Sequence, residues 1–224
     1  PVNGISNPKT NRERPMTLTM AHSSEPLAAS LNERIGHLHQ AIRSREGDGA
    51  TALATFIERY VALVPEFIEV FEDFLASAGI SGEIKRQIAT AQEFLHVPVD
   101  IRTSAEDLEA KMYQAYLAHR LLEELNDVLN AHYNCRVIPV DMTRSNLIVH
   151  HIIGEPFANK IDGAIQLLND KLIASLRKDH ALAEKLHTYT NTLSQDPSLR
   201  YPCLTESSNI RLLFKGQNSR VRLQ

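Results

Sequence analysis

The chain of 224 residues lacks most of the features that would place it in a familiar class. It has no tryptophan, only nine glycines and only two cysteines, Cys135 and Cys203. Two cysteines without paired spacing argue against a disulfide framework and are typical of reduced thiols in a cytoplasmic protein. No apolar run approaches the ~20 residues that cross a bilayer, and nothing near the start resembles a secretory signal. We therefore expect a soluble, cytoplasmic protein with no membrane partner.

Neither sign of charge dominates, because 24 lysines and arginines face 27 aspartates and glutamates. This balance does not predict a nucleic-acid-binding protein. The basic residues near the end of the chain, Arg211, Lys215, Arg220 and Arg222, have no aromatic residues between them of the kind that stack on bases. No Gly-x-Ser-x-Gly, Gly-x-Gly-x-x-Gly or Walker sequence occurs either. We expect neither a nucleic-acid partner nor nucleophilic catalysis.

Apolar residues recurring at helical spacing are the main positive feature of the sequence. They predict helices at about residues 25–44, 53–78, 81–95, 104–133, 144–153, 157–176 and 182–193. The period of the second helix continues straight through Pro65, which predicts one kinked helix and not two. We therefore predict an all-α fold, a single-domain bundle of six or seven helices that occupies residues 25–196.

The two ends of the chain depart from this pattern. Residues 1–24 are a polar mixture that we interpret as disordered, partly left over from cloning, with Met16 or Met20 as the natural start. Residues 197–224 form a basic tail in which Ile210, Leu212 and Phe214 alternate with other residues, as do Val221 and Leu223. This alternation leaves open a small C-terminal β-hairpin or a docked coil.

The predicted helix at residues 104–133 has two polar side chains on its apolar stripe. Because they share the helical period of the leucines, His119 and Asn126 should be buried, and each then needs hydrogen-bond partners, since an unsatisfied buried group costs about 1–3 kcal/mol. The stripe consists of Leu108, Met112, Ala115, His119, Leu122, Asn126, Leu129 and Tyr133.

Two interpretations of His119 remain open. Glu123 lies four residues later on the same helix face, where its carboxylate could orient the imidazole and raise its basicity. The alternative, which we favour, is an ordinary core histidine that bonds a neighbouring backbone carbonyl.

Histidines and carboxylates also supply candidate metal ligands. The Glu-x-x-His pattern, which ferritin-like di-iron bundles use on two helices, occurs as Glu93 with His96 and as Glu184 with His187. Roughly one such match is expected by chance from this composition, so the pattern is weak. His150 lies in an apolar setting that lowers an imidazole pKa, as a base or ligand requires. The candidate metal ligands are His119, Glu123, Glu93, His96, Glu66 and His150.

A haem site is a second cofactor candidate. Residues 32–39, with His37 and His39, are loosely similar to the early helix that carries the ligand histidine in haem-oxygenase-like proteins, and this resemblance implies haem as a cofactor. No glycine-rich distal motif accompanies the segment.

Two functional hypotheses follow. The leading one is a non-catalytic binding or interaction module without a cofactor, which binds a protein partner, a second copy of itself or a small apolar ligand. The acidic residues Glu66, Glu69, Glu72 and Asp73 and the basic tail would serve that interaction, and an exposed Phe67 and Val70 beside them would favour a dimer. The alternative is a redox enzyme of bundle type that depends on non-haem iron or haem.

Overall fold

The computed structural model describes residues 27–29, 31, 42–44, 49–98, 108–192 and 210–212. The described part is predominantly helical, which confirms the predicted all-α bundle. Its elements are β1 (Ile42–Ser44), α2 (Gly49–Ala78), α3 (Glu83–Phe94), α4 (Leu108–Tyr133), α5 (Thr143–Ile153), α6 (Phe157–Leu176), α7 (His180–Thr192) and β2 (Ile210–Leu212).

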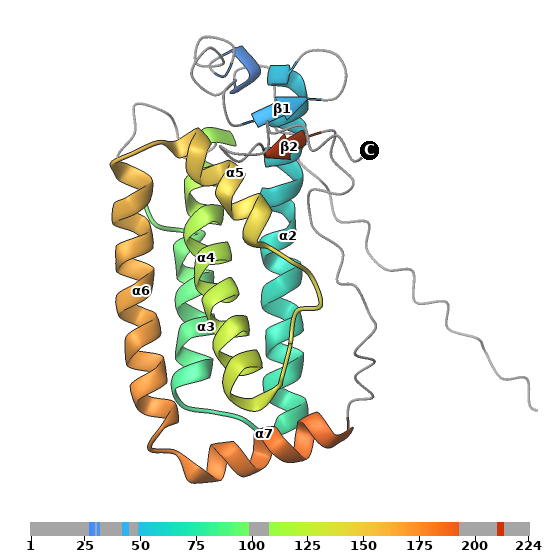
Figure 1. Cartoon of the computed structure of the whole chain (residues 1–224), viewed down its shortest axis with the longest axis vertical. Helices are drawn as coiled ribbons and strands as arrows, with labels where there is room; N and C mark the ends of the chain where they lie inside the picture. Colours follow the sequence, from blue (N-terminus) through green and yellow to red (C-terminus); the bar gives the residue numbers. More distant parts are fainter. Residues whose placement is uncertain are drawn as a thin grey trace, which may run out of the picture.

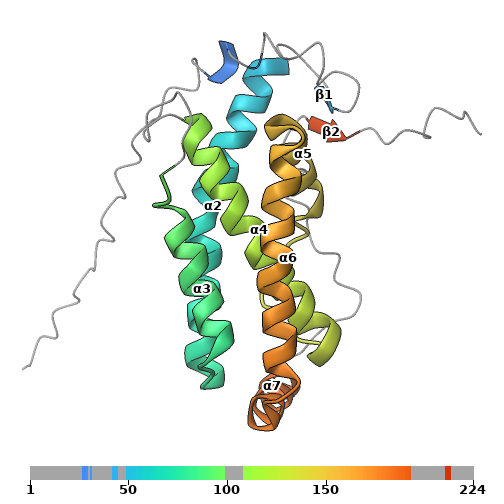
Figure 2. The same cartoon turned by 90° about the vertical axis from the view of Figure 1, so that its left-hand side faces the viewer.

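Helix α4 is the central element of the bundle. It contacts α2, α3, α5, α6 and α7, and its buried residues lie around most of its circumference. A helix that is buried on nearly every side belongs to the middle of a core. Figure 1 shows α2 and α6 on opposite sides of α4, with α7 crossing the lower end of the bundle. The same arrangement can be followed in Figure 2, where α3 lies beside α2.

Helix α2 confirms the prediction of one helix through a proline, because Pro65 lies inside it. The proline has no N–H to donate to the Val61 carbonyl, yet the apolar face on both sides of it stays buried in the same register. Gly79 follows the helix with a φ of 61°, a left-handed conformation that suits glycine and ends the helix.

The predicted exposure of Phe67 is wrong. Its side chain is 7 % exposed and joins the core, whereas Val70 is 40 % exposed on the outer face of α2. Phe67 lies one turn from Val64 and Phe71, both buried, so it belongs to the inner stripe of the helix. Only Val70 therefore remains as an apolar contact on the outer face.

The two short strands correct two predictions. Ile42–Ser44 pairs antiparallel with Ile210–Leu212, with Ile42 opposite Leu212 and Ser44 opposite Ile210. The first predicted helix therefore does not extend to residue 44, because three residues are too few for their spacing to distinguish a helix end from a strand. A C-terminal hairpin is not supported either, since the partner of Ile210–Leu212 comes from the other end of the chain. Residues 1–24 and the tail residues Phe214, Val221 and Leu223 lie outside the described residues.

The later helices lie close to their predicted positions. α5 ends at Gly154, which has a φ of 82° and donates its N–H to the His150 carbonyl. Over the described ranges, no helix combines the length and the apolar character that crossing a bilayer would require.

Candidate functional site

His119 on α4 is a fully buried core histidine. Its Nε2 lies 2.7 Å from the backbone oxygen of Tyr60 on α2 and must donate, because a carbonyl only accepts. The imidazole also stacks at a tilt on the Tyr60 ring, with 4.0 Å between centroids, and meets the Phe67 ring edge-on at 5.5 Å. These contacts agree with the favoured prediction of a core histidine that bonds a backbone carbonyl, and they join α4 to α2.

The environment of His119 keeps its ring neutral. Burial lowers the pKa of His119 to about 4, although the hydrogen bond to Tyr60 favours the charged form. Within the described residues Nδ1 has no hydrogen-bond partner, so Glu123 does not orient this imidazole and that interpretation is wrong. The side chain of Glu123 instead bonds Arg120, Thr143 and Asn146.

Asn126, the second predicted buried polar residue, holds the connection between α4 and α5. It is 2 % exposed, and its Oδ1 accepts the backbone N–H groups of Val137 and Ile138 at 2.9 Å each. Its Nδ2 donates to the Ile138 carbonyl at 3.3 Å. The amide thus replaces the backbone partners that this extended segment lacks.

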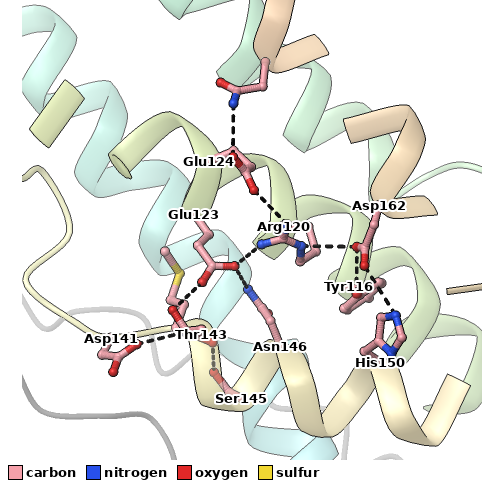
Figure 3. A network of polar contacts seen from close by, with 12 residues as sticks. Tyr116, Arg120, Glu123, Glu124, Asp141, Thr143, Ser145, Asn146, His150 and Asp162 are labelled. Carbon is pink, nitrogen blue, oxygen red and sulfur yellow. Dashed lines mark hydrogen bonds and ion pairs between the residues drawn. The ribbon is translucent and has the colours of Figure 1, made fainter. Parts of the chain in front are cut away.

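Glu123 binds the first turn of α5 to α4 (Figure 3). Its Oε1 accepts the Thr143 hydroxyl at 2.8 Å, and its Oε2 accepts the Asn146 amide at 2.6 Å and an ion pair from Arg120. Thr143 and Asn146 are three residues apart and therefore share one face of α5. Asn146 Oδ1 accepts the Tyr60 hydroxyl at 2.5 Å, so this chain of hydrogen bonds reaches α2.

Arg120 lies at the centre of the network and contacts three carboxylates. Besides Glu123, its Nη2 donates to Glu124 at 2.8 Å and its Nε to Asp162 of α6 at 3.2 Å. Burial by itself would lower the pKa of Arg120, but the surrounding carboxylates raise it, so the guanidinium stays charged. Burial, and then the negative charges of Glu123 and Glu124, raise the pKa of neighbouring Asp127, although Arg136 and Arg120 oppose this shift.

Asp162 connects the network to α5 and α6. Its Oδ1 accepts the Tyr116 hydroxyl at 2.8 Å, and its Oδ2 lies 3.4 Å from His150 Nε2. The same His150 nitrogen lies 3.0 Å from Asn159 Oδ1. Burial, and then the bond to Asp162, raises the pKa of Tyr116, which keeps its proton as a donor.

The structure does not assemble the candidate metal ligands into one site. Glu66, Glu93 and His96 are exposed, while His150 and Glu123 belong to the same network without touching each other. Among the residues that the structure describes, no three or more histidine, cysteine, aspartate or glutamate side chains are grouped so as to hold a metal ion. The haem candidates His37 and His39 lie outside the described residues.

Part of this network has a signal in the sequence, although the predictions from helical spacing do not include it. Tyr116, Arg120 and Glu123 follow one face of α4 at spacings of four and three, which predicts neighbouring side chains. Thr143 and Asn146 show the same three-residue spacing next to an apolar run. Spacing identifies such faces but not their partners on other helices, so Asp162 could not be inferred.

A second group of carboxylates lies on the outer face of α2. We name this surface the acidic stripe, defined as Ala62, Glu66, Glu69, Val70 and Asp73, all exposed. No lysine or arginine occurs between Arg59 and Lys85 in the sequence, and no cationic side chain in the described ranges forms an ion pair with a stripe carboxylate. Like charges three and four residues apart destabilise a helix by about 0.2–0.5 kcal/mol per pair.

Comparison with known protein families, curated proteins and solved structures finds nothing that matches this chain. The geometry of the two carboxylate groups is therefore the basis for a functional proposal.

Proposed function

We propose that this chain is a non-catalytic helical interaction module that binds a protein partner through the acidic stripe of α2. One observation carries the proposal: Glu66, Glu69 and Asp73 are exposed side by side without a cation among the described residues, and Val70 is 40 % exposed between them. A helix that departs from a local stability rule without internal compensation marks a functional surface. A partner that supplies cations would remove the repulsion.

The chemistry of the stripe defines the partner. Carboxylates at helical spacing around one valine match a helix that carries lysines or arginines around an exposed leucine or similar side chain. Because exposed charges contribute mainly to the association rate and to specificity, binding should weaken strongly with salt. We expect this partner in the cytoplasm, since the two cysteines are typical of a reducing compartment.

The interior supports a non-catalytic role. The donor nitrogen of His119 is occupied by the Tyr60 carbonyl, and both carboxylate oxygens of Glu123 accept protein donors. An iron enzyme that used Glu123 as a ligand would have to break its hydrogen bonds and leave Arg120, Thr143 and Asn146 without that carboxylate, at a cost of about 1–3 kcal/mol for each buried group. His119 Nδ1 has no partner among the described residues, but no group of three or more histidine, cysteine, aspartate or glutamate side chains in those residues could hold a metal ion beside it.

A peptide titration tests the proposal. The probe is a fluorescently labelled amphipathic helix with lysines and leucines at heptad spacing, and its anisotropy is followed as protein is added at low and high salt. The triple variant Glu66→Gln, Glu69→Gln, Asp73→Asn should bind about tenfold more weakly, because losing three exposed contacts of roughly 0.5 kcal/mol each removes about 1.5 kcal/mol.

The matched control changes three exposed carboxylates elsewhere, Glu93→Gln, Glu155→Gln and Glu184→Gln, and alters the net charge equally. It should bind the peptide nearly as tightly as the unmodified protein. An equal loss of binding in both triple variants would overturn the proposal, because the attraction would then depend on net charge and not on the stripe.

A further inference from the structure

The outer face of α6 has the opposite character to the acidic stripe. Leu167 is 65 % exposed, more than any other large apolar side chain in the described ranges, and lysines lie along the same face. Asp170 borders this face and accepts a hydrogen bond from Gln166 at 3.2 Å. We name the face the basic seam, whose exposed residues recur at alternating steps of four and three: Lys160, Ala164, Leu167, Lys171, Ala174 and Lys178.

We propose that the basic seam of one copy docks on the acidic stripe of a second copy, so that the chain associates head to tail. This inference rests on the proposed function and names its partner. Its basis is charge complementarity, since the stripe holds three carboxylates and no cation, and the seam holds three lysines and no anion at its own positions. Each surface also has one exposed apolar side chain, Val70 or Leu167.

The spacing of the two surfaces allows their charges to meet. If Leu167 contacts Val70, Lys171 lies one turn from that contact. If α6 of one copy runs antiparallel to α2 of the other, Lys171 faces Glu66. If the two helices run parallel, Lys171 faces Asp73, so either direction brings the lysine to a carboxylate. Small residues in the seam, Ala164 and Ala174, let two helix axes approach to the ~8–10 Å of ordinary helix packing.

The two surfaces of one chain cannot satisfy each other. α2 and α6 lie on opposite sides of α4 in Figure 1 and stay apart in Figure 2. The contact is therefore heterologous, and it builds rings or open chains of copies, not a symmetric dimer. Its few ion pairs and single apolar contact bury less than the ~1,200 Å² of a stable interface, which predicts weak association that salt abolishes.

Sedimentation velocity over a range of protein concentrations tests this inference. At low salt the mean mass of the unmodified protein should rise with concentration. One double variant, Lys160→Glu with Lys171→Glu, reverses the charge of the seam, and another, Glu66→Lys with Asp73→Lys, reverses the charge of the stripe. Each should remain monomeric up to protein concentrations about tenfold higher than the unmodified protein does, because the attraction between the two surfaces becomes repulsion.

The decisive variant carries all four reversals in one chain and has the same net charge as the unmodified protein. It should associate again, because its stripe is now basic and its seam acidic. The matched control combines the stripe reversal with Lys85→Glu and Arg144→Glu, two exposed cations outside the seam. That control has the same net charge and should stay monomeric.

The outcomes separate the inference from the proposed function. An unmodified protein that stays monomeric at every concentration, or a fourfold variant that does not recover association, overturns self-association. The peptide titration tests the proposed function separately. A protein that stays monomeric but binds the basic peptide through Glu66 and Asp73 would still use the acidic stripe to bind a partner. Helical circular dichroism equal to that of the unmodified protein verifies that each variant is folded.

Discussion

The interior network and the acidic stripe contain the same chemical group in opposite circumstances. Inside, Glu123, Glu124 and Asp162 converge on Arg120 and accept further donors from α5 and α6. Outside, the carboxylates of Glu66, Glu69 and Asp73 repel one another without a cation in the described ranges. A carboxylate therefore stabilises this fold where the surrounding helices supply its partners. We propose that the carboxylates of the acidic stripe, which have no such partners among the described residues, bind another molecule.

The largest expected effect comes from removing the cation of the interior network. Arg120→Met leaves three carboxylates without their common partner and should lower the free energy of unfolding by about 3–5 kcal/mol, as for other buried ion pairs that lose one member. Urea denaturation measures it. The matched control is Arg86→Met, whose exposed pair with Glu83 should contribute less than about 0.5 kcal/mol. An equal loss of unfolding free energy in the two variants would show that the interior network stabilises the fold no more than an exposed ion pair does.

The second expected effect concerns the connection that Asn126 holds. Asn126→Ala leaves the N–H groups of Val137 and Ile138 without an acceptor and should destabilise the protein by about 3–4 kcal/mol. Asn130→Ala, one turn away and only partly buried, is the control and should change stability by less than about 0.5 kcal/mol. Hydrogen exchange at Val137 and Ile138 should accelerate in the first variant alone. Unchanged exchange would contradict the role given to Asn126.

The third prediction concerns pH. Because the folded pKa of His119, about 4, lies below the usual 6.5, the unfolded chain binds a proton that the folded protein refuses between these values. The contribution of His119 to stability is therefore fully present above about pH 6.5 and declines by roughly 3 kcal/mol as the pH falls to 4. His119→Gln keeps a donor for the Tyr60 carbonyl but cannot titrate, so its stability should fall less steeply. Parallel stability curves for the two proteins would refute this explanation.

The smallest expected effect on the free energy of unfolding has the opposite sign, because it comes from removing repulsion on the outer face of α2. Glu69→Gln removes repulsion with Glu66 and Asp73 on α2 and should raise the free energy of unfolding by about 0.3–0.5 kcal/mol. Glu93→Gln serves as the control, because no carboxylate lies three or four residues from it on α3. A loss of stability on changing Glu69 would mean that the stripe stabilises the fold and would weaken its assignment as a partner surface.

The features that could be predicted from the sequence are those that depend on local spacing. Helical periodicity predicted the bundle and the continuation of α2 through Pro65, and the same period placed His119 and Asn126 in the core. Features that depend on contacts between distant segments could not be predicted. The carbonyl that binds His119 lies 59 residues earlier in the chain, and no pattern near His119 indicates it.

Two other features of the structure could not be predicted for the same reason, because they depend on contacts between distant segments. The Arg120 network depends on Asp162, 42 residues later, so its spacing on α4 alone could be taken for a solvated face. Likewise, the alternation around Ile210–Leu212 indicated a strand, but the pairing with Ile42–Ser44 follows from how the bundle brings the two segments together. Local patterns determine which face a side chain occupies, and tertiary packing determines its partner.

We infer that the polar residues buried on α4 join the helices through hydrogen bonds within the protein and do not bind a metal ion. Long-range proton–nitrogen correlation spectra of the His119 imidazole test it most directly, recorded from neutral pH downward with and without added zinc(II) or iron(II). We predict a neutral ring protonated on Nε2 that stays neutral until the pH approaches its pKa of about 4 and does not respond to either metal. A ring protonated on Nδ1, a normal pKa near 6.5, or a stoichiometric change on adding metal would contradict the claim.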